Sequence, residues 1–252
     1  MKRIALVTGA TSGFGEATAR LLAQNGYKLI ITGRRKERLE SLKDELTSKY
    51  STDILALTFD VRSKEEVGKA VDSLPAEWKR IDVLVNNAGL AVGLEHIQDG
   101  NTDDWDRMVD TNVKGLLYMT RAVAPLMVEQ GCGHIVNIGS VAGKDVYENG
   151  GVYCATKFAV DAISKSTRID LLKHNIKVTQ ICPGLAETEF SLVRFKGDEA
   201  KAKTPYTGIE AMTAEDIASI ILYVISLPPH LCINDLVVTP TAQANAVYSY
   251  KK

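Results

Sequence analysis

The sequence predicts a single α/β domain, with a doubly wound parallel sheet of about seven strands and helices on both faces. Short apolar runs alternate with segments of helical period along the 252 residues, which is the pattern of βαβ units. A glycine-rich turn directly follows the first apolar run, where such a sheet turns from strand to helix. The chain contains no repeat, low-complexity tract or linker, so one domain accounts for its whole length.

The first half of the chain alternates regularly between strand and helix. Predicted strands cover residues 4–7, 28–32, 54–59 and 82–85, and predicted helices end at Leu22, span 36–46 and run from Ser63 to Leu74. Ser63 and Glu66 form the S-x-x-E pattern of a capping box, which marks the start of the third helix. Residues 1–3 lead straight into the first apolar run without a cleavage-site pattern, so we expect a strand there and no signal peptide.

The second half has longer helices and one irregular segment. Helices are predicted from about Trp105 past Asn112 toward Val128, over 151–173 and after a Thr213–Asp216 cap, and strands over 134–138, 177–181 and 236–238. Residues 185–207 break the pattern with Gly197, Pro205 and several basic side chains. This long connection follows the carboxyl end of a strand, where open α/β sheets bind ligands, so we expect it to be a lid.

Charge and composition exclude several classes of partner. The 30 basic and 31 acidic side chains nearly cancel, which argues against nucleic acid or an anionic membrane as a partner. The longest apolar runs, such as 217–225, are too short to span a bilayer. The four cysteines form no C-x-x-C pair, so we predict no metal site and expect a reduced, cytoplasmic protein.

The turn after the first strand predicts a nucleotide site. Gly9, Gly13 and Gly15 are spaced G-x-x-x-G-x-G, and a helix that opens there would point free N–H groups at a pyrophosphate. Glycine-rich turns also occur as plain structure, so the motif alone is not decisive. The second strand ends in Arg34 and Arg35 with no acid at its tip, and arginine forks suit a 2′-phosphate. We therefore predict NADP, the alternative being that both arginines are only solvated.

A second group of residues predicts acid–base chemistry. Tyr153 and Lys157 are four residues apart in a predicted helix and would share one face. A nearby cation favours the phenolate and is expected to lower the Tyr153 pKa toward neutrality, as a general acid or base requires. Ser140, at the end of a predicted strand, would offer a hydroxyl to the same place. Such a pair is common on helices, and the neighbouring motifs are what favour catalysis.

Taken together, these motifs resemble the short-chain dehydrogenase/reductase family. The matching positions, in order, are Thr8–Gly15, Asn86–Gly89, Asn112, Ser140, Tyr153, Lys157 and Pro183–Thr188, and the likeness covers essentially residues 1–252. A closer likeness, carried by Thr32–Arg35, Leu74–Glu77 and Glu187–Gly197, is to NADP-dependent 3-hydroxy acid dehydrogenases, also described as serine or L-allo-threonine dehydrogenases. The resemblance implies a Rossmann-type fold and a homotetramer with the Asn112 and Tyr153 helices between subunits.

The resemblance also implies roles for individual residues. Tyr153 would be the general acid or base of a hydride transfer, Lys157 would lower its pKa, Ser140 would bind the substrate oxygen, and Asn112 would hold a water. The cofactor would contact Gly9, Thr11, Ser12, Gly13, Phe14, Gly15, Arg34, Arg35, Asp60, Val61, Asn87, Ala88, Gly89, Tyr153, Lys157, Pro183, Gly184 and Thr188.

The substrate is predicted to be a small 3-hydroxy acid or its semialdehyde. Arg194 is the first candidate for its carboxylate and Lys196 the second, because both lie in the expected lid. For an amino acid substrate, Asp145, Glu148 and Glu187 remain open as partners of the ammonium. The alternatives are a reductase of a neutral ketone, steroid or sugar, and a nucleotide-sensing protein without catalysis.

Overall fold

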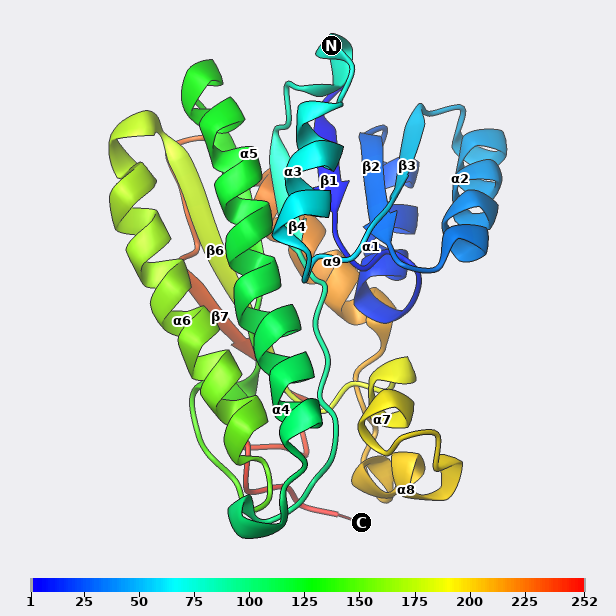
Figure 1. The fold of residues 1–252 in the computed structure, drawn as a ribbon, viewed down its shortest axis with the longest axis vertical. Coiled ribbons are helices and arrows are strands. Elements are labelled where there is room, and N and C mark those ends of the chain that lie inside the picture. Colours follow the sequence, from blue (N-terminus) through cyan, green and yellow to red (C-terminus); the bar gives the residue numbers. More distant parts are fainter. Residues whose placement is uncertain (1, 252) are drawn as a thin grey trace.

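Seven short, mostly apolar runs pair side by side into one parallel sheet in the computed structural model, which describes residues 2–251 (Figure 1). The strands are β1 (Ile4–Val7), β2 (Lys28–Gly33), β3 (Ile54–Thr58), β4 (Val83–Asn86), β5 (Gly133–Ile138), β6 (Ile176–Pro183) and β7 (Asp235–Val238). Their order is β3-β2-β1-β4-β5-β6-β7, so the chain winds outward in both directions from the β1/β4 pair. The predicted doubly wound sheet is confirmed, and its turning point lies between β1 and β4.

Helices cover both faces because successive strand residues point to opposite sides and both sides are apolar. The α-helices are α1 (Gly13–Gln24), α2 (Lys36–Tyr50), α3 (Lys64–Asp72), α4 (Thr102–Val109), α5 (Leu116–Gln130), α6 (Gly151–Leu171), α7 (Glu189–Arg194), α8 (Glu199–Lys203) and α9 (Ala214–Ser226). Val7 belongs to the core shared with α1, α2 and α9, and its neighbour Leu6 to the core shared with α3 and α5. Within residues 2–251, no helix has both the length and the apolar character that crossing a bilayer requires.

The long helix predicted past Asn112 is continuous but not regular. Asp110–Gly115 form a π-helix between α4 and α5. Because π-turns shift the side chains that follow them and are frequent at functional sites, this irregularity marks the position of Asn112. Nothing in the hydrophobic pattern predicts it.

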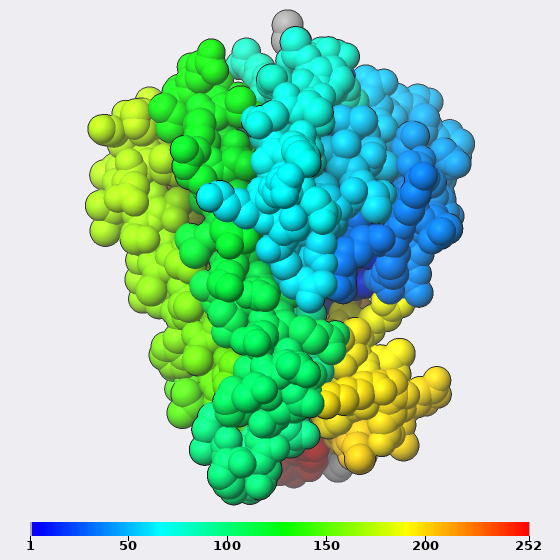
Figure 2. Space-filling view, in the orientation of Figure 1, coloured from blue at the N-terminus to red at the C-terminus, as the bar shows by residue number. Residues whose placement is uncertain are grey.

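The expected lid, residues 185–207, is largely helical and not irregular as predicted. Thr188 caps α7 by accepting a bond from the Phe190 N–H, and Asp198 caps α8 in the same way through Lys201. Gly197, with φ of +92°, lies between the two helices, so it ends one helix without preventing the next. In Figure 2 this segment forms the yellow block at the lower right of the molecule. The cap residues Thr188 and Asp198 are recognisable in the sequence. The helix breakers Gly197 and Pro205, however, favoured the prediction of an irregular segment.

Two helix starts test the capping predictions. Thr213 and Asp216 form a complete capping box at α9, as predicted. At α3 the box is only half formed: Ser63 accepts from the Glu66 N–H, but the Glu66 carboxylate accepts from the Asp60 N–H at 3.0 Å. Glu66 therefore fixes the turn after β3 and does not close the box.

Candidate active site

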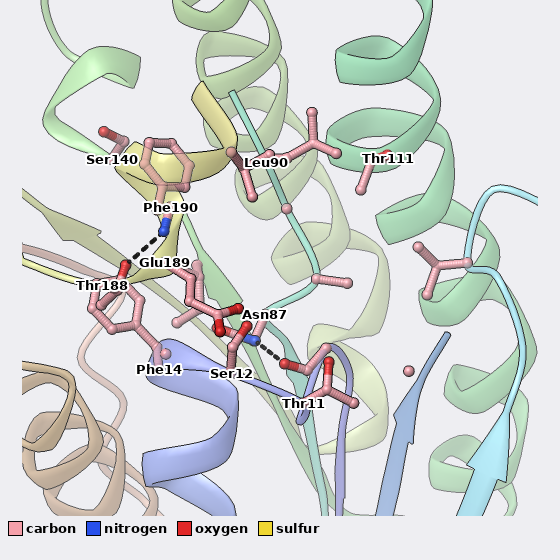
Figure 3. Close-up of a pocket in the computed structure, with 18 of the residues that line it drawn as sticks. Thr11, Ser12, Phe14, Asn87, Leu90, Thr111, Ser140, Thr188, Glu189 and Phe190 are labelled. Carbon is pink, nitrogen blue, oxygen red and sulfur yellow. Dashed lines mark hydrogen bonds between the residues drawn. The ribbon is translucent and has the colours of Figure 1, made fainter. Parts of the chain in front are cut away.

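A cavity of about 310 Å³ opens at the carboxyl edge of the sheet (Figure 3). Its wall combines the loops that follow β1 to β6 with part of α7. Every residue predicted to serve the cofactor or the chemistry lines it, except Gly15 and Asn112, and the predicted substrate residue Arg194 lies outside its wall. Since most of these residues come from the loops after six strands, and Tyr153 and Lys157 come from α6, the parallel sheet is what brings them together.

The turn after β1 forms a cradle that depends on missing side chains. Gly9 and Gly13 have φ of +67° and +54°, which glycine adopts without strain. A Cβ atom on Gly15 would lie 2.4 Å from both the side-chain Nδ2 of Asn87 and the backbone carbonyl oxygen of Gly9. The Ser12 side chain does not cap α1, which leaves the first N–H groups of that helix for a ligand. Backbone donors in a close-fitting loop suit the pyrophosphate of a dinucleotide.

The two arginines after β2 have different surroundings. The Arg34 side chain is 57% exposed, lines the cavity and lies 3.9 Å from the Asp60 carboxylate. Arg35 donates to the Thr11 hydroxyl at 2.9 Å, to the Ser12 hydroxyl at 2.8 Å and to the Glu189 carboxylate at 2.9 Å. Arg34 thus keeps its fork available for a phosphate, whereas Arg35 joins the glycine-rich turn to α7.

Tyr153, Lys157 and Ser140 meet at the ends of β5 and β6. Tyr153 and Lys157 are both buried on α6, and the Lys157 Nζ lies 5.9 Å from the centre of the Tyr153 ring. Lys157 donates to the Ile138 carbonyl at 2.9 Å, which fixes its ammonium behind the tyrosine. The Ser140 hydroxyl accepts from the Ala142 N–H at 3.1 Å and also lines the cavity.

The predicted lowering of the Tyr153 pKa is wrong. Burial of the phenol and the neighbouring Tyr147 raise the Tyr153 pKa, and they outweigh the Ser140 hydroxyl and the Arg194 guanidinium, which favour the phenolate. Burial also lowers the pKa of Lys157 to about 8. Spacing along a helix brings the two groups together but does not include the cost of desolvating them. Tyr153 therefore carries its proton at neutral pH, as a general acid needs.

Asn112 connects the loop after β4 to α6. Its Oδ1 accepts from the Leu90 N–H and its Nδ2 donates to the Leu90 carbonyl, both at 2.8 Å. Nδ2 also donates to the Thr156 hydroxyl at 3.0 Å, next to Lys157 in the sequence. The side chain is paired with protein groups and positions the elements on either side of the cavity. Its role in holding a water remains a prediction.

Arg194 reaches Tyr153 from the lid although it does not line the main cavity. Its guanidinium carbon lies 5.4 Å from the ring centres of both Tyr147 and Tyr153, and it donates to the Tyr147 hydroxyl. Its Nε is buried without a hydrogen-bond partner. Phe190, also in the lid, packs edge-on against Tyr153 with ring centres 5.7 Å apart. A buried guanidinium N–H beside the acid–base residue is a donor that an anionic ligand would satisfy.

Comparison with known proteins agrees with this geometry. Residues 3–198 match the family model described as short chain dehydrogenase. The chain belongs to this family. The NADP-dependent 3-hydroxy acid dehydrogenase YdfG of Salmonella typhimurium is 51% identical over 96% of this chain and 97% of its own. Sulfoacetaldehyde reductase 2 of Chromohalobacter salexigens is 45% identical over 99% of this chain and 98% of its own.

A solved structure described as the closed form of serine dehydrogenase complexed with NADP+ has the same architecture. It superposes with a TM-score of 0.93 at 49% identity and covers 99% of both chains. Serine dehydrogenase from Escherichia coli superposes with a TM-score of 0.82 at 45% identity, over 96% of this chain and 99% of that one. The predicted Rossmann-type fold and oxidoreductase class are confirmed by these similarities and by the family.

Three residues of the site were not predicted from the sequence. Tyr147 and Phe190 flank Tyr153, and Glu189 lines the cavity. Tyr147 belongs to no motif and could be suspected only from its place between Ser140 and Tyr153. Phe190 and Glu189 follow the cap residue Thr188, so recognition of α7 would have placed them at the start of a helix facing the site.

Proposed function

We propose that this chain is an NADP-dependent oxidoreductase that transfers hydride between the nicotinamide and the 3-hydroxyl carbon of a small 3-hydroxy acid. The same site would reduce the matching semialdehyde or 3-oxo acid. The observation that carries the proposal is the Arg194 guanidinium, stacked on Tyr153 with an unpaired buried Nε. Residues 1–252 form one domain in this account, and residues 185–207 serve as the lid that brings Arg194 to the site.

The residues of the chain supply or accept the transferred proton and orient the substrate oxygen. When bound, the nicotinamide supplies or accepts the hydride. In the reducing direction Tyr153 donates its phenolic proton to the carbonyl oxygen, and its raised pKa keeps that proton in place beforehand. Ser140 offers a hydroxyl to the same oxygen, and Lys157 lies behind the ring, where its ammonium favours the phenolate that remains. In the oxidising direction Tyr153 accepts the proton of the substrate hydroxyl.

The preference for NADP rests on the end of β2. Arg34 is half exposed at the cavity wall, and the Asp60 carboxylate, which lies 3.9 Å from it, is engaged by Arg62 at 2.6 Å. With no free acid at the strand tip to bind ribose hydroxyls, this position favours a 2′-phosphate. Two of the relatives named above support this preference: YdfG is described as NADP-dependent, and the closed form of serine dehydrogenase as complexed with NADP+.

The acids near the site favour a substrate without an ammonium group. Of the three acids considered for that role, only Glu148 lines either described cavity, and it belongs to a second one of about 450 Å³ that Tyr153 also lines. The carboxylates on the wall of the first cavity are Asp60 and Glu189, and both pair with arginines. The first cavity therefore favours an anion such as 3-hydroxypropanoate over serine, because both carboxylates on its wall are already paired.

A sulfonate is the second candidate for the anion. The sulfoacetaldehyde reductase relatives, at 45% and 46% identity over nearly their whole length, are named for such a substrate. A guanidinium fork binds a sulfonate by the same charge-assisted hydrogen bonds as a carboxylate. Rates with sulfoacetaldehyde and malonic semialdehyde, measured side by side, decide between the two anions.

Arg194→Ala is expected to lower kcat/KM for carboxylate substrates by about 10- to 100-fold, because charge-assisted hydrogen bonds contribute on the order of 1.5–3 kcal/mol. The rate with an uncharged aldehyde such as propanal should change little. Lys196→Ala tests the second candidate in the lid and should cost less, since the Lys196 ammonium already pairs with the Asp104 carboxylate at 2.6 Å. Equal losses for charged and uncharged substrates would remove Arg194 from anion recognition.

We further propose that the protein is a cytoplasmic homotetramer. Large apolar side chains are exposed on α5, α6 and the turn after α6: Leu117 at 41%, Phe158 at 41%, Ile169 at 75% and Leu172 at 71%. Exposed apolar side chains on the two helices expected between subunits support an interface there. A monomer mass from light scattering would contradict the tetramer. The four free cysteines support a reducing compartment, which cell fractionation tests.

A further inference from the structure

The Glu189 carboxylate links two parts of the chain that are far apart in sequence. It accepts from the Arg35 Nη1 at 2.9 Å and from the Arg38 Nη1 at 2.7 Å. These arginines lie at the start of α2, directly after the strand tip that is proposed to bind the 2′-phosphate, whereas Glu189 is the first residue of α7. One carboxylate therefore bridges the cofactor side of the site and the lid.

This bridge extends into the glycine-rich turn. Arg35 also donates to the hydroxyls of Thr11 and Ser12, and Arg38 lies 3.4 Å from the Thr11 carbonyl. In Figure 3 the Glu189 side chain extends from α7 toward the turn that carries Thr11 and Ser12. The pyrophosphate cradle, the start of α2 and the lid are consequently held together around one anion.

The position of Glu189 also affects the reacting end of the cavity. The next residue, Phe190, packs on the Tyr153 ring, and Arg194, about one turn beyond Phe190 on α7, lies near the same ring. Releasing Glu189 would free the first turn of α7 and with it both contacts to Tyr153. By binding the arginines at the start of α2, the Glu189 carboxylate thus keeps Phe190 and Arg194 in place.

The same anion lowers the positive charge near the 2′-phosphate. Arg34, Arg35, Lys36 and Arg38 place four cations within five residues, and Glu189 pairs with two of them, Arg35 and Arg38. Burial opposes ionisation of Glu189, but the bonds from Arg38 and Arg35 outweigh it and hold its pKa below the usual range, so the carboxylate is charged at neutral pH. A 2′-phosphate that approaches these arginines must therefore compete with the Glu189 carboxylate, which is already bound to Arg35 and Arg38.

We propose that Glu189 is an internal counter-ion of the 2′-phosphate subsite, a positioning residue that holds α7 over the active site and weakens cofactor binding in return. The inference rests on the proposed NADP dependence. Its signature is a pair of opposite effects: without the carboxylate, the 2′-phosphate binds more tightly while the lid opens more easily. A residue with a merely structural role would not tighten a ligand when it is lost.

The test uses Glu189→Gln, which keeps the size of the side chain and removes its charge. Adenosine 2′,5′-bisphosphate, titrated by calorimetry at low ionic strength, is expected to bind about three- to tenfold more tightly than to the wild type, as one charge at close range implies. The gain should shrink in high salt, because the cluster is half exposed. Adenosine 5′-monophosphate, which lacks the 2′-phosphate, should bind both proteins equally.

The lid is followed in the same proteins by limited trypsin digestion. Cleavage within residues 194–203 is expected to be faster in Glu189→Gln, which neither adds nor removes a trypsin site. Glu199→Gln is the matched control, an exposed glutamate at the start of α8, and should leave both readouts at wild-type values. Arg38→Gln should speed lid cleavage without tightening the bisphosphate, because it breaks the bridge and removes a cation.

The outcomes separate the inference from the function on which it rests. If the wild type binds the bisphosphate and the monophosphate equally, the NADP assignment fails and the inference falls with it. If the wild type prefers the bisphosphate but Glu189→Gln fails to tighten it, or its lid is cleaved no faster than in Glu199→Gln, the inference alone is overturned. Tighter binding together with faster cleavage supports it.

Discussion

Replacing Tyr153 with phenylalanine is expected to lower kcat by about 10²- to 10⁴-fold, the usual contribution of a positioned general acid. The substitution removes only the hydroxyl, so the ring contacts with Phe190 and Arg194 remain. Cofactor binding should stay close to the wild-type value, because the phenol donates a proton to the substrate and does not hold the nucleotide loop. Initial rates and titration of NADPH fluorescence measure the two quantities separately.

Tyr223→Phe provides the control for this prediction. Tyr223 is 59% exposed on α9, away from the cavity, and its loss should leave both rate and binding unchanged. If Tyr153→Phe kept a rate comparable to that of Tyr223→Phe, Tyr153 would not be the general acid.

Lys157→Met is expected to abolish most activity and at the same time to stabilise the protein without ligand. Burial lowers the Lys157 pKa to about 8, which at about 1.4 kcal/mol for each tenfold change corresponds to a cost of about 3 kcal/mol for the charged form in the folded state. Loss of the bond to the Ile138 carbonyl offsets about 1 kcal/mol of that gain. A net gain of about 2 kcal/mol in the free energy of unfolding should remain at pH 7.

The stability advantage of Lys157→Met over the wild type depends on pH, because the charge of Lys157 does. Below pH 8 Lys157 is protonated in the folded and the unfolded state, so the folded state bears the full cost of the buried charge. Between pH 8 and the unfolded pKa of about 10.4, the unfolded chain binds more protons, and wild-type stability rises with pH. The advantage of Lys157→Met should therefore be largest at or below pH 8 and disappear near pH 10.5.

Denaturant unfolding of Lys157→Met and of Lys173→Met at three pH values makes the comparison. Lys173 is an exposed lysine in the turn after α6, so its replacement should leave stability unchanged at every pH. If Lys157→Met were less stable than the wild type at pH 7, the ammonium would stabilise the fold and the burial argument would be wrong.

Local features of the sequence predicted the sheet and most of the site. Each strand is a short apolar run followed by a turn, and a parallel sheet places the residues after such runs at one edge, so Gly9, Asn87 and Ser140 converge without further information. The likeness to the family then added the individual roles of these residues.

Long-range contacts account for what the sequence did not predict. Glu189 and Arg35 are 154 positions apart, and no local pattern pairs them. Asn112, within the π-helix, bonds to Leu90 and Thr156, which only the folded chain brings near. The direction of the Tyr153 pKa shift depends on burial beneath side chains from the lid, and helical spacing carries no information about that.

The rate of NADP+ reduction by the wild-type protein with 3-hydroxypropanoate tests the central claim most directly. We predict turnover that is faster than with serine, faster than with 1-propanol, which lacks the carboxylate, and much slower when NAD+ replaces NADP+. Equal rates with both cofactors, or turnover of the uncharged alcohol alone, would contradict the proposed hydroxy acid dehydrogenase.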